Sequence, residues 1–378
     1  MKKMVRKSLC VIICFCIFIS LCGCWNYRGL NQMAIVSGIA IDKTDDGRYH
    51  LSMEVVDASA AKESATKAML IECEGDTILS AIRDAKRRSM NKLYISHAQV
   101  IIVSHQIAEE EGILSIIDLF LRDSEIRETC HMVISQELTA KMLFSAYGMH
   151  NSLAAFEISE IIDEDSSVAA STTYVQMYEI FQKIKSGGED LALTACHITK
   201  NDEIKVIEVA GTAVFKGDKL IGYLDTQESK CLLFAVDEIE GGVLTLKYED
   251  VNVTLEIKKS KTSVSFSETD GNLKFSIAIK TRVFIAEYDG MLDSLDESVT
   301  NGIKAAAEEK LKTEMETLVL KVQNEYKSDI FGFGNKIYKR NLKLWKEISE
   351  SWYDIFSGVE VEILPEIEIV STSLLKKT

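Results

Sequence analysis

Apolar and polar residues alternate with a period of two in several segments of the chain. In the segment 33–57, alternating apolar residues flank Asp45-Asp46-Gly47, which predicts a β-hairpin. The clearest alternation lies in 251–258 and 273–280, and the Asp270-Gly271 pair between them is typical of a type I′ turn. Because this period puts successive side chains on opposite faces, we expect sheets with one solvated and one packed face.

The first half of the chain mixes strands and helices. Apolar residues spaced three or four apart predict helices after Gly75 and over 113–121, and the apolar run 93–103 between them predicts one buried strand. The remaining expected elements are a helix or loop at 58–74, a strand at 130–134, a helix at 138–147 and a largely helical stretch at 150–185. This succession is typical of an α/β or α+β arrangement.

The second half combines hairpins with one long helix. A hairpin is predicted over 212–224, with its turn at Gly217-Asp218. Apolar residues from Val299 to Tyr326 recur every three or four positions over about seven turns, which predicts an amphipathic helix laid on the alternating strands. A second helix near 337–356 and a closing strand at 359–369 complete this half.

These patterns predict a multi-domain α+β fold, with an N-terminal mixed α/β region and a C-terminal antiparallel sheet packed on the long amphipathic helix. Glycine and Asn-Asp pairs interrupt the pattern around 186–212. We therefore expect two domains, at 24–205 and 206–378, after a leading segment at 1–23.

This leading segment differs from the rest in charge and hydropathy. It contains four basic residues and no acidic one, and residues 9–21 are apolar except for Ser20. Such a pattern is typical of a secretory signal, and the run is shorter than the roughly 20 apolar residues of a spanning helix. An uncleaved anchor helix or an ordinary secreted protein is the alternative interpretation.

The end of this segment resembles a bacterial lipobox. In Leu21-Cys22-Gly23-Cys24, a small residue precedes Cys24, as the cleavage requires, and the following thiol would carry the diacylglyceryl group. Cys22 does not fit, because Leu21 would occupy the position of the small residue. We predict lipid attachment at Cys24.

Removal of residues 1–23 leaves 39 basic and 58 acidic residues, a formal charge of about −19. Such an acidic body has no general attraction for nucleic acid, which excludes that class of partner, and it is repelled by an anionic bilayer. Stable attachment to a membrane needs at least two acyl chains, which a diacylglyceryl cysteine supplies. We therefore expect a lipid-anchored protein on the outer face of a cytoplasmic membrane.

Residues that could carry catalysis or bind a metal are scattered. The six histidines form neither H-x-x-x-H nor H-E-x-x-H, and the chain contains no G-x-S-x-G or P-loop motif. His97 lies in an apolar run, which favours a core histidine over a metal ligand, and Gly332-Phe333-Gly334 favours a tight turn before a helix. The acidic runs 109–111 and 163–165 are typical of solvated helix ends, with calcium as a weaker alternative. We predict no enzymatic activity, no cofactor and no metal.

Four cysteines lie outside the leading segment and the lipid site: Cys73, Cys130, Cys196 and Cys231. They form no C-x-x-C pair, so neither a zinc nor a redox site is expected. The expected compartment permits one or two disulfides, but four separately buried thiols are the simpler interpretation.

Aromatic residues gather near the C-terminus. Trp345, Trp352 and Phe356 are spaced by seven and four residues, which places them on one helical face if the segment is a single helix. Such stripes usually pack in a core, and an exposed part would form a partner surface because aromatic residues dominate interface energetics. The candidate interface residues are Phe331, Phe333, Trp345 and Trp352.

Four motifs stand in one order along the chain: the lipobox continuing into 24–26 and 33–42, then 93–102, then 211–222, and last 329–334 followed by Tyr338 and Trp345. Together they resemble the C subunit of spore germinant receptors, the Ger(x)C lipoprotein family, over essentially the whole length. The resemblance implies several α+β domains and, among residue roles, only lipid attachment at Cys24.

The resemblance also implies a non-enzymatic function. The chain would act with a membrane A subunit and a transporter-like B subunit at the spore inner membrane, where the receptor detects nutrient germinants. Two other classes are weighed against this one. A lipoprotein that captures the germinant directly needs a cleft between two similar lobes, and a cell-wall hydrolase needs a catalytic site that the sequence does not contain.

Overall fold

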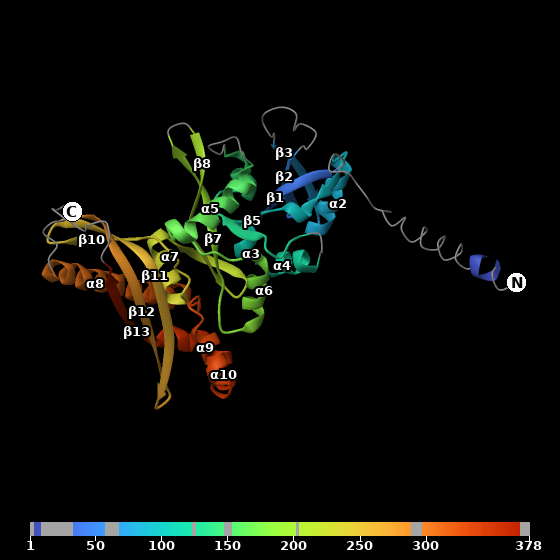
Figure 1. Ribbon diagram of the computed structural model, residues 1–378. Coiled ribbons are helices and arrows are strands. Elements are labelled where there is room, and N and C mark those ends of the chain that lie inside the picture. The colour runs from blue at the N-terminus through green and yellow to red at the C-terminus, as the bar shows by residue number, and fades with distance from the viewer. Residues whose placement is uncertain are drawn as a thin grey trace.

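The computed structural model describes residues 4–8, 33–56, 68–122, 126–146, 153–201, 204–288 and 297–370. Within this part of the chain, the strands form a nine-stranded sheet and a four-stranded sheet. Figure 1 shows the two sheets at opposite ends of an elongated body, with α7 (Thr226–Val236) between them. This α+β architecture confirms the predicted fold class.

The first sheet is mixed. Its order is β3-β2-β1-β5-β6-β7-β8-β9, with β4 paired to β1. Strands β1, β5, β6 and β7 run parallel to one another, and antiparallel pairs flank them on both sides. The strands are β1 (Met33–Lys43), β2 (Tyr49–Val56), β3 (Ala68–Gly75), β4 (Lys92–Tyr94), β5 (Val100–Ser104), β6 (His131–Ser135), β7 (Ala192–Asn201), β8 (Ile204–Lys216) and β9 (Lys219–Leu224). The two predicted hairpins, β1–β2 and β8–β9, are confirmed.

Helices cover both faces of this sheet, and each face has its own apolar core. One core includes residues of α2 (Ile78–Arg88), α3 (His105–Glu110), α4 (Leu114–Arg122) and α6 (Met177–Ser186). The other includes α5 (Ala154–Val168) and a 3-10 helix at Ala140–Ser145.

A buried carboxylate fixes the start of α5. Glu54 on β2 accepts hydrogen bonds from the backbone N–H groups of Ala154 and Ala155, at 2.8 and 3.1 Å. The hydroxyl of Ser37 on β1 donates to the same carboxylate at 2.6 Å. Since the first N–H groups of a helix have no partner within it, Glu54 joins the start of α5 to strand β2.

The second sheet has the order β10-β11-β12-β13. Its strands are β10 (Val243–Tyr248), β11 (Val251–Thr269), β12 (Asn272–Tyr288) and β13 (Glu360–Ile369). Asp270 and Gly271 both have positive φ, at 51° and 80°, which confirms the type I′ turn. The first three strands are antiparallel, whereas β13 runs parallel to β12, a detail that the alternation does not specify.

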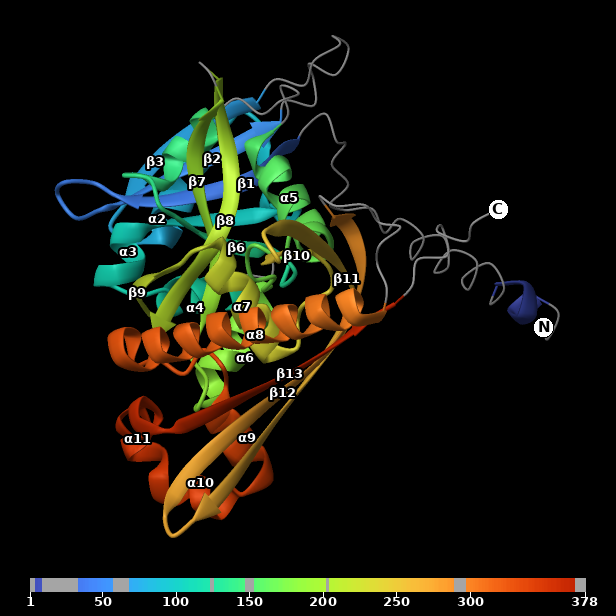
Figure 2. The same ribbon diagram turned by 90° about the vertical axis from the view of Figure 1, so that its left-hand side faces the viewer.

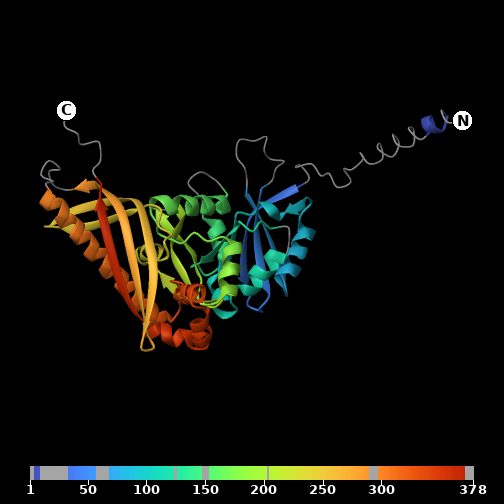
Figure 3. The ribbon, with the colours of Figure 1, turned by 60° about the horizontal axis from the view of Figure 1, so that its bottom comes forward.

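The long helix α8 (Glu297–Lys321) lies along one face of the second sheet, as Figures 2 and 3 show. Its buried residues are Ile303, Ala307, Leu311, Met315, Leu318 and Val319, which follow the predicted apolar face. A π-helix (Val322–Tyr326) extends it. Among the described residues, no helix combines the length and the apolar character that crossing a membrane requires.

The predicted helix near 337–356 is broken into short pieces: α9 (Phe333–Arg340), α10 (Leu342–Ile348), a 3-10 helix (Ser349–Ser351) and α11 (Trp352–Gly358). The first break lies at Asn341, whose backbone leaves the helical region and whose side chain accepts a hydrogen bond from the N–H of Leu344. An N-cap of this kind starts a new helix, so the prediction of a single helix is wrong.

Three other elements also differ from the predictions. A 3-10 helix at Ile95–His97 divides the expected strand 93–103 into β4 and β5. Within the predicted helix 138–147, residues Ala140–Ser145 form a 3-10 helix instead of an α-helix, and the buried carboxylate of Asp42 accepts hydrogen bonds from its first N–H groups. Residues 68–75 form strand β3 at the edge of the first sheet.

Candidate functional site: the joint between the two sheets

A loop of the first sheet meets the segment that precedes the last helices. The backbone N–H of Asp190 donates to the carbonyl oxygen of Asp329 at 2.9 Å, and the N–H of Asn335 donates to the carbonyl oxygen of Gly188 at 2.7 Å. The hydroxyl of Ser328 donates to the carbonyl oxygen of Phe215 on β8 at 2.5 Å. We name residues 187–190, 329–335 and 345–353 the joint, because they connect the two sheets.

Asp329 is the central residue of the joint, and its carboxylate is buried. Its Oδ1 accepts from the N–H of Phe333 at 3.0 Å, and its Oδ2 accepts from the N–H of Gly334 and from the indole Nε1–H of Trp352, at 2.8 and 3.0 Å. Burial raises the pKa of Asp329 to about 7, against the opposing effect of these three donors. One carboxylate thus fixes the start of α9 to the start of α11.

Asp190 extends this network to the first sheet. Its Oδ2 accepts the backbone N–H of Asp329 at 2.8 Å, and its Oδ1 accepts the N–H of Gly217 at 2.8 Å. The hydroxyl of Tyr353 on α11 also donates to Oδ1, at 3.0 Å. Burial, followed by the nearby Asp190 carboxylate, raises the pKa of Tyr353, so the phenol remains protonated as a donor.

A second carboxylate pairs with a cation at the edge of the joint. Glu189 lies 2.9 Å from the ammonium of Lys183 on α6, and the amide of Asn335 donates to it at 2.8 Å. Burial alone would raise the pKa of Glu189, but Lys183 and Asn335 hold that pKa below its usual range. The hydrogen bond from Asn335 to Glu189 is a further polar connection between the two sheets, and Lys183 holds Glu189 from the side of the first sheet.

Glycines permit the close approach of the two segments. Gly332 has φ of +69° directly before α9, which confirms the predicted tight turn. Gly188 and Gly334 face each other, and a Cβ on Gly334 would lie 2.8 Å from the Cα and the carbonyl oxygen of Gly188. The end of the Trp345 ring closes the same space, also 2.8 Å from that Cβ. Only glycines fit here without a shift of backbone.

We therefore expect the substitution Gly334→Ala to lower the free energy of unfolding by about 1–3 kcal/mol, the usual range for overpacking. Gly358→Ala is the matched control, because a Cβ at Gly358 meets no atom within 4 Å. The control should be neutral or slightly stabilising at the end of a helix. Urea unfolding followed by circular dichroism measures both changes, and equal midpoints for the two variants would contradict the close approach.

A small hollow opens beside the joint. Its volume is about 310 Å³, and Gly187, Gly188, Glu189, Asp190, Asp329, Trp345, Ser349, Trp352 and Tyr353 line it. That volume is at the lower end of the range for small-molecule sites. The carboxylates of Asp190 and Asp329 are fully engaged with donors of the protein itself, so the arrangement serves first to hold the two sheets together.

The structure places the four candidate interface residues around this joint. Phe331, Phe333 and Trp352 are buried in the core of the second sheet, where Phe333 stacks on Phe275 with ring centroids 4.3 Å apart. Trp345 is half-buried and meets Trp352 edge-on at 5.6 Å. A partner could reach only Trp345 without opening the core, and whether one does so stays a prediction.

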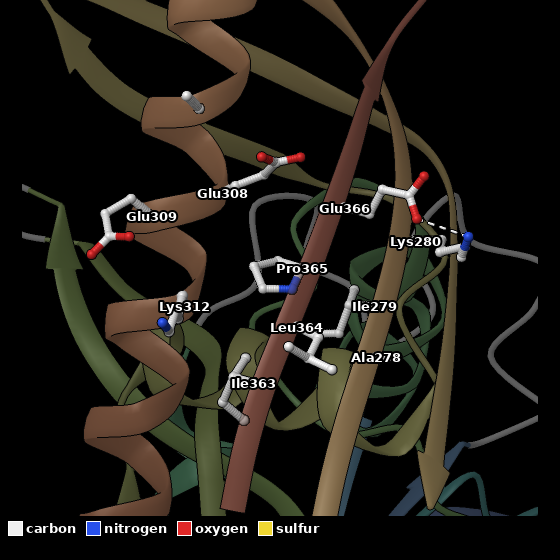
Figure 4. Close-up of a pocket in the computed structure, with 11 residues that line it drawn as sticks. Ala278, Ile279, Lys280, Glu308, Glu309, Lys312, Ile363, Leu364, Pro365 and Glu366 are labelled. Atoms are coloured by element: carbon white, nitrogen blue, oxygen red, sulfur yellow. Dashed lines mark ion pairs between the residues drawn. The ribbon is translucent and has the colours of Figure 1, made fainter.

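A second hollow lies between α8 and the edge of the second sheet. It has a volume of about 450 Å³, and Figure 4 shows Glu308, Glu309 and Lys312 on the helix side and Leu364, Pro365 and Glu366 on the strand side. Its polar groups largely satisfy one another: Lys280 pairs with Glu366 at 2.7 Å, and Glu308 accepts the N–H of Ile367 at 2.8 Å. We regard the joint as the stronger candidate site.

The other residues considered for chemistry have structural partners. The His97 ring is half-buried and meets the Phe156 ring at 5.7 Å. Asp165 is buried and accepts hydrogen bonds from Ser171 and Thr172, so the expectation of a solvated end at 163–165 is wrong for this residue. In the described part of the chain, no group of three or more His, Cys, Asp or Glu residues has the geometry of a metal site.

The four cysteines Cys73, Cys130, Cys196 and Cys231 are free and buried, which confirms the interpretation as separate thiols. Burial raises the pKa of Cys73 to about 11 and the pKa values of Cys130 and Cys231 to about 12, and it raises that of Cys196 as well. Because the thiolate is the reactive form, these residues are poor nucleophiles. The predicted lipid site, Cys24, lies outside the described residues.

Comparisons with known families agree with this architecture. The family model "Spore germination protein N-terminal domain" matches residues 26–198, and the model "Spore germination B3/GerAC like, C-terminal" matches residues 210–373. The chain belongs to the spore germination B3/GerAC-like family. This confirms the resemblance inferred from the four motifs and assigns the chain a role in spore germination. The family is not a known enzyme family.

Individual members of this GerAC-like family match over nearly their whole length. Spore germination protein B3 of Bacillus subtilis (strain 168) is 24% identical, covering 97% of this chain and 98% of that protein. Spore germination protein A3 of the same organism is 25% identical, covering 94% and 95%. The crystal structure of the GerBC protein has the same fold, with a TM-score of 0.58 and 21% identity over 88% of this chain and 97% of that chain.

The family motifs are neighbours in space. The motif 33–42 lies in β1, which pairs in parallel with β4 and β5, the strands of the motif 93–102. The motif 211–222 forms the β8–β9 hairpin, whose Gly217 binds Asp190 in the joint, and the motif 329–334 supplies Asp329. The sequence motifs identify these segments, but no feature of the sequence around Asp190 indicates that this residue connects the segments 211–222 and 329–334. The predicted division at 205/206 falls at the start of β8 and stays a prediction.

Proposed function

We propose that this chain is the lipid-anchored subunit of a nutrient germinant receptor. In this account the thioether at Cys24 holds it on the outer face of the spore inner membrane, where it binds an A-type membrane subunit and a transporter-like B-type subunit. It works through protein–protein contact and catalyses no reaction.

The observation that carries this proposal is the pair of family matches over residues 26–198 and 210–373. Relatives named spore germination proteins A3, B3 and KC align over 94–97% of this chain. The lipobox supports the anchor, since an acidic body of about −19 needs a covalent attachment to stay at an anionic membrane.

A second candidate is a lipoprotein that captures the germinant directly, and the hollow of about 310 Å³ at the joint favours it. The two sheets differ in size and topology, however, unlike the two similar lobes expected for such a protein. Calorimetry with candidate amino acids and sugars distinguishes the two functions. Saturable binding that Trp345→Ala removes would establish direct capture.

Deletion of the gene is expected to abolish germination triggered by nutrients and to leave the yield of dormant spores unchanged. The measurement is the fall in optical density of a spore suspension after nutrients are added, in a strain without sister receptors. Restoring the gene should restore the fall. Normal germination of the deletion strain on every nutrient mixture would refute the proposed function.

A further inference from the structure

The helix α2 and the loop that follows it carry positive charge in an acidic protein. Residues 78–92 contain five basic residues and one acidic residue, whereas the whole chain has a formal charge of −15. The basic residues are Arg83, Lys86, Arg87, Arg88 and Lys92. We name these five residues, together with Met90, the basic patch.

The fold holds the patch in a fixed place with its side chains outward. The opposite face of α2 is buried against the first sheet through Ile78, Ala81, Ile82 and Ala85. Arg83, Arg87, Arg88 and Lys92 are exposed. Met90, in the loop after α2, is a fully exposed apolar side chain.

Nearby carboxylates leave a net positive charge. Asp84 is the acidic residue within the patch segment, and it pairs with Arg87 and Arg88 at 3.5 and 3.0 Å. On the adjacent strand β3, Glu72 pairs with Lys141 at 2.7 Å and Glu74 pairs with Arg48 at 2.6 Å. Arg48 also pairs with Asp46 at 2.8 Å, so it balances Glu74 only in part. Set against Asp84, the exposed Arg83, Arg87, Arg88 and Lys92 still carry an excess of positive charge.

The patch lies where the chain enters its first strand. Met33, the first residue of β1, is the register partner of Lys92 in the parallel pair of β1 and β4. Met33 follows Cys24 by nine positions along the chain, and nine residue steps span at most roughly 30 Å. Figures 1 and 3 show α2 at the end of the body opposite α8 and the second sheet.

We propose that the basic patch is a second contact with the membrane, in which its Lys and Arg side chains bind anionic phospholipid headgroups and Met90 enters the interfacial layer. The proposal rests on the lipid anchor of the proposed function. Charge complementarity supports it: the rest of the body is repelled by an anionic surface, while basic residues within about a Debye length, roughly 10 Å, are attracted. The anchor and the patch together would set the orientation of the body, with the second sheet turned away from the bilayer.

The test uses the full chain, lipid-modified in bacteria and reconstituted into vesicles of phosphatidylcholine alone or mixed with phosphatidylglycerol. An environment-sensitive dye on Met90→Cys reports contact, and the four native cysteines, being buried, escape labelling. We expect a blue shift and protection from an aqueous quencher in the anionic vesicles only, both lost at high salt. The double variant Arg83→Glu/Lys92→Glu should lower this protection roughly tenfold or more, because two attractive charges become repulsive.

Lys343→Glu/Lys346→Glu on the distant helix α10 is the matched control and should leave the signal unchanged. Failure of the chain to float with either vesicle would refute the anchor. Two outcomes would overturn the patch proposal alone. In the first, the chain floats with both vesicles but the dye gives no blue shift with anionic lipid. In the second, the dye response persists in the Arg83→Glu/Lys92→Glu variant. A response that requires the other receptor subunits in the membrane would also overturn it, because the patch would then bind a protein.

Discussion

Replacement of Asp329 by alanine is expected to lower the free energy of unfolding by about 3 kcal/mol or more. The substitution leaves three donors in the joint without an acceptor: the N–H groups of Phe333 and Gly334 and the indole N–H of Trp352. Each unsatisfied buried donor costs about 1–3 kcal/mol, and relief of the buried carboxylate offsets part of the total. The start of α11 then loses its connection to the start of α9.

Urea unfolding followed by circular dichroism measures this effect. Asp329→Asn should give an intermediate loss, because its one acceptor oxygen cannot serve both positions of the carboxylate. Asp354→Ala is the matched control, since Asp354 lies on α11, whose first residue Trp352 binds Asp329, and is exposed. If Asp329→Ala unfolded at the same urea concentration as the control, the joint would not hold the two sheets together.

Replacement of Cys24 by alanine is expected to remove the lipid and release the protein from the membrane. Without the diacylglyceryl group, the acidic body has no covalent hold on the bilayer, and the basic patch alone gives only reversible attraction. The variant should lose radioactive palmitate, leave the spore membrane fraction and abolish nutrient-triggered germination. Cys24 is not part of the described apolar cores, so the fold of the described residues should be unchanged in this variant.

Cys22→Ala provides the control for this prediction. It removes the neighbouring thiol but leaves Gly23-Cys24 intact, so labelling and germination should persist. Labelling that survives in the Cys24 variant and disappears in the Cys22 variant would reverse the assignment of the lipid site.

The parts of the fold that depend on local periodicity could be predicted from the sequence. The alternation around Asp270-Gly271 specifies the β11–β12 hairpin, and the apolar spacing of Ile303, Ala307 and Leu311 specifies the buried face of α8. Such patterns predict helices and strands correctly because the same face of the element is buried along its whole length.

The parts that depend on single polar residues could not be predicted. The helix break at Asn341 comes from a capping side chain within an otherwise helical stretch. The contacts of the joint depend even less on local sequence. Asp190 binds Asp329, which lies 139 positions later in the chain, and Tyr353, which lies 163 positions later. The glycines at 187–188 and 332–334 are visible in the sequence, but one chain alone does not show that they meet.

The most direct test of the receptor-subunit account is the mass of the N-terminal peptide of the protein isolated from spores. Digestion of the membrane fraction followed by mass spectrometry should yield a peptide that starts at Cys24, with the mass of a diacylglyceryl thioether on its sulfur. A water-soluble polypeptide with an unmodified N-terminus at any other residue would contradict the account.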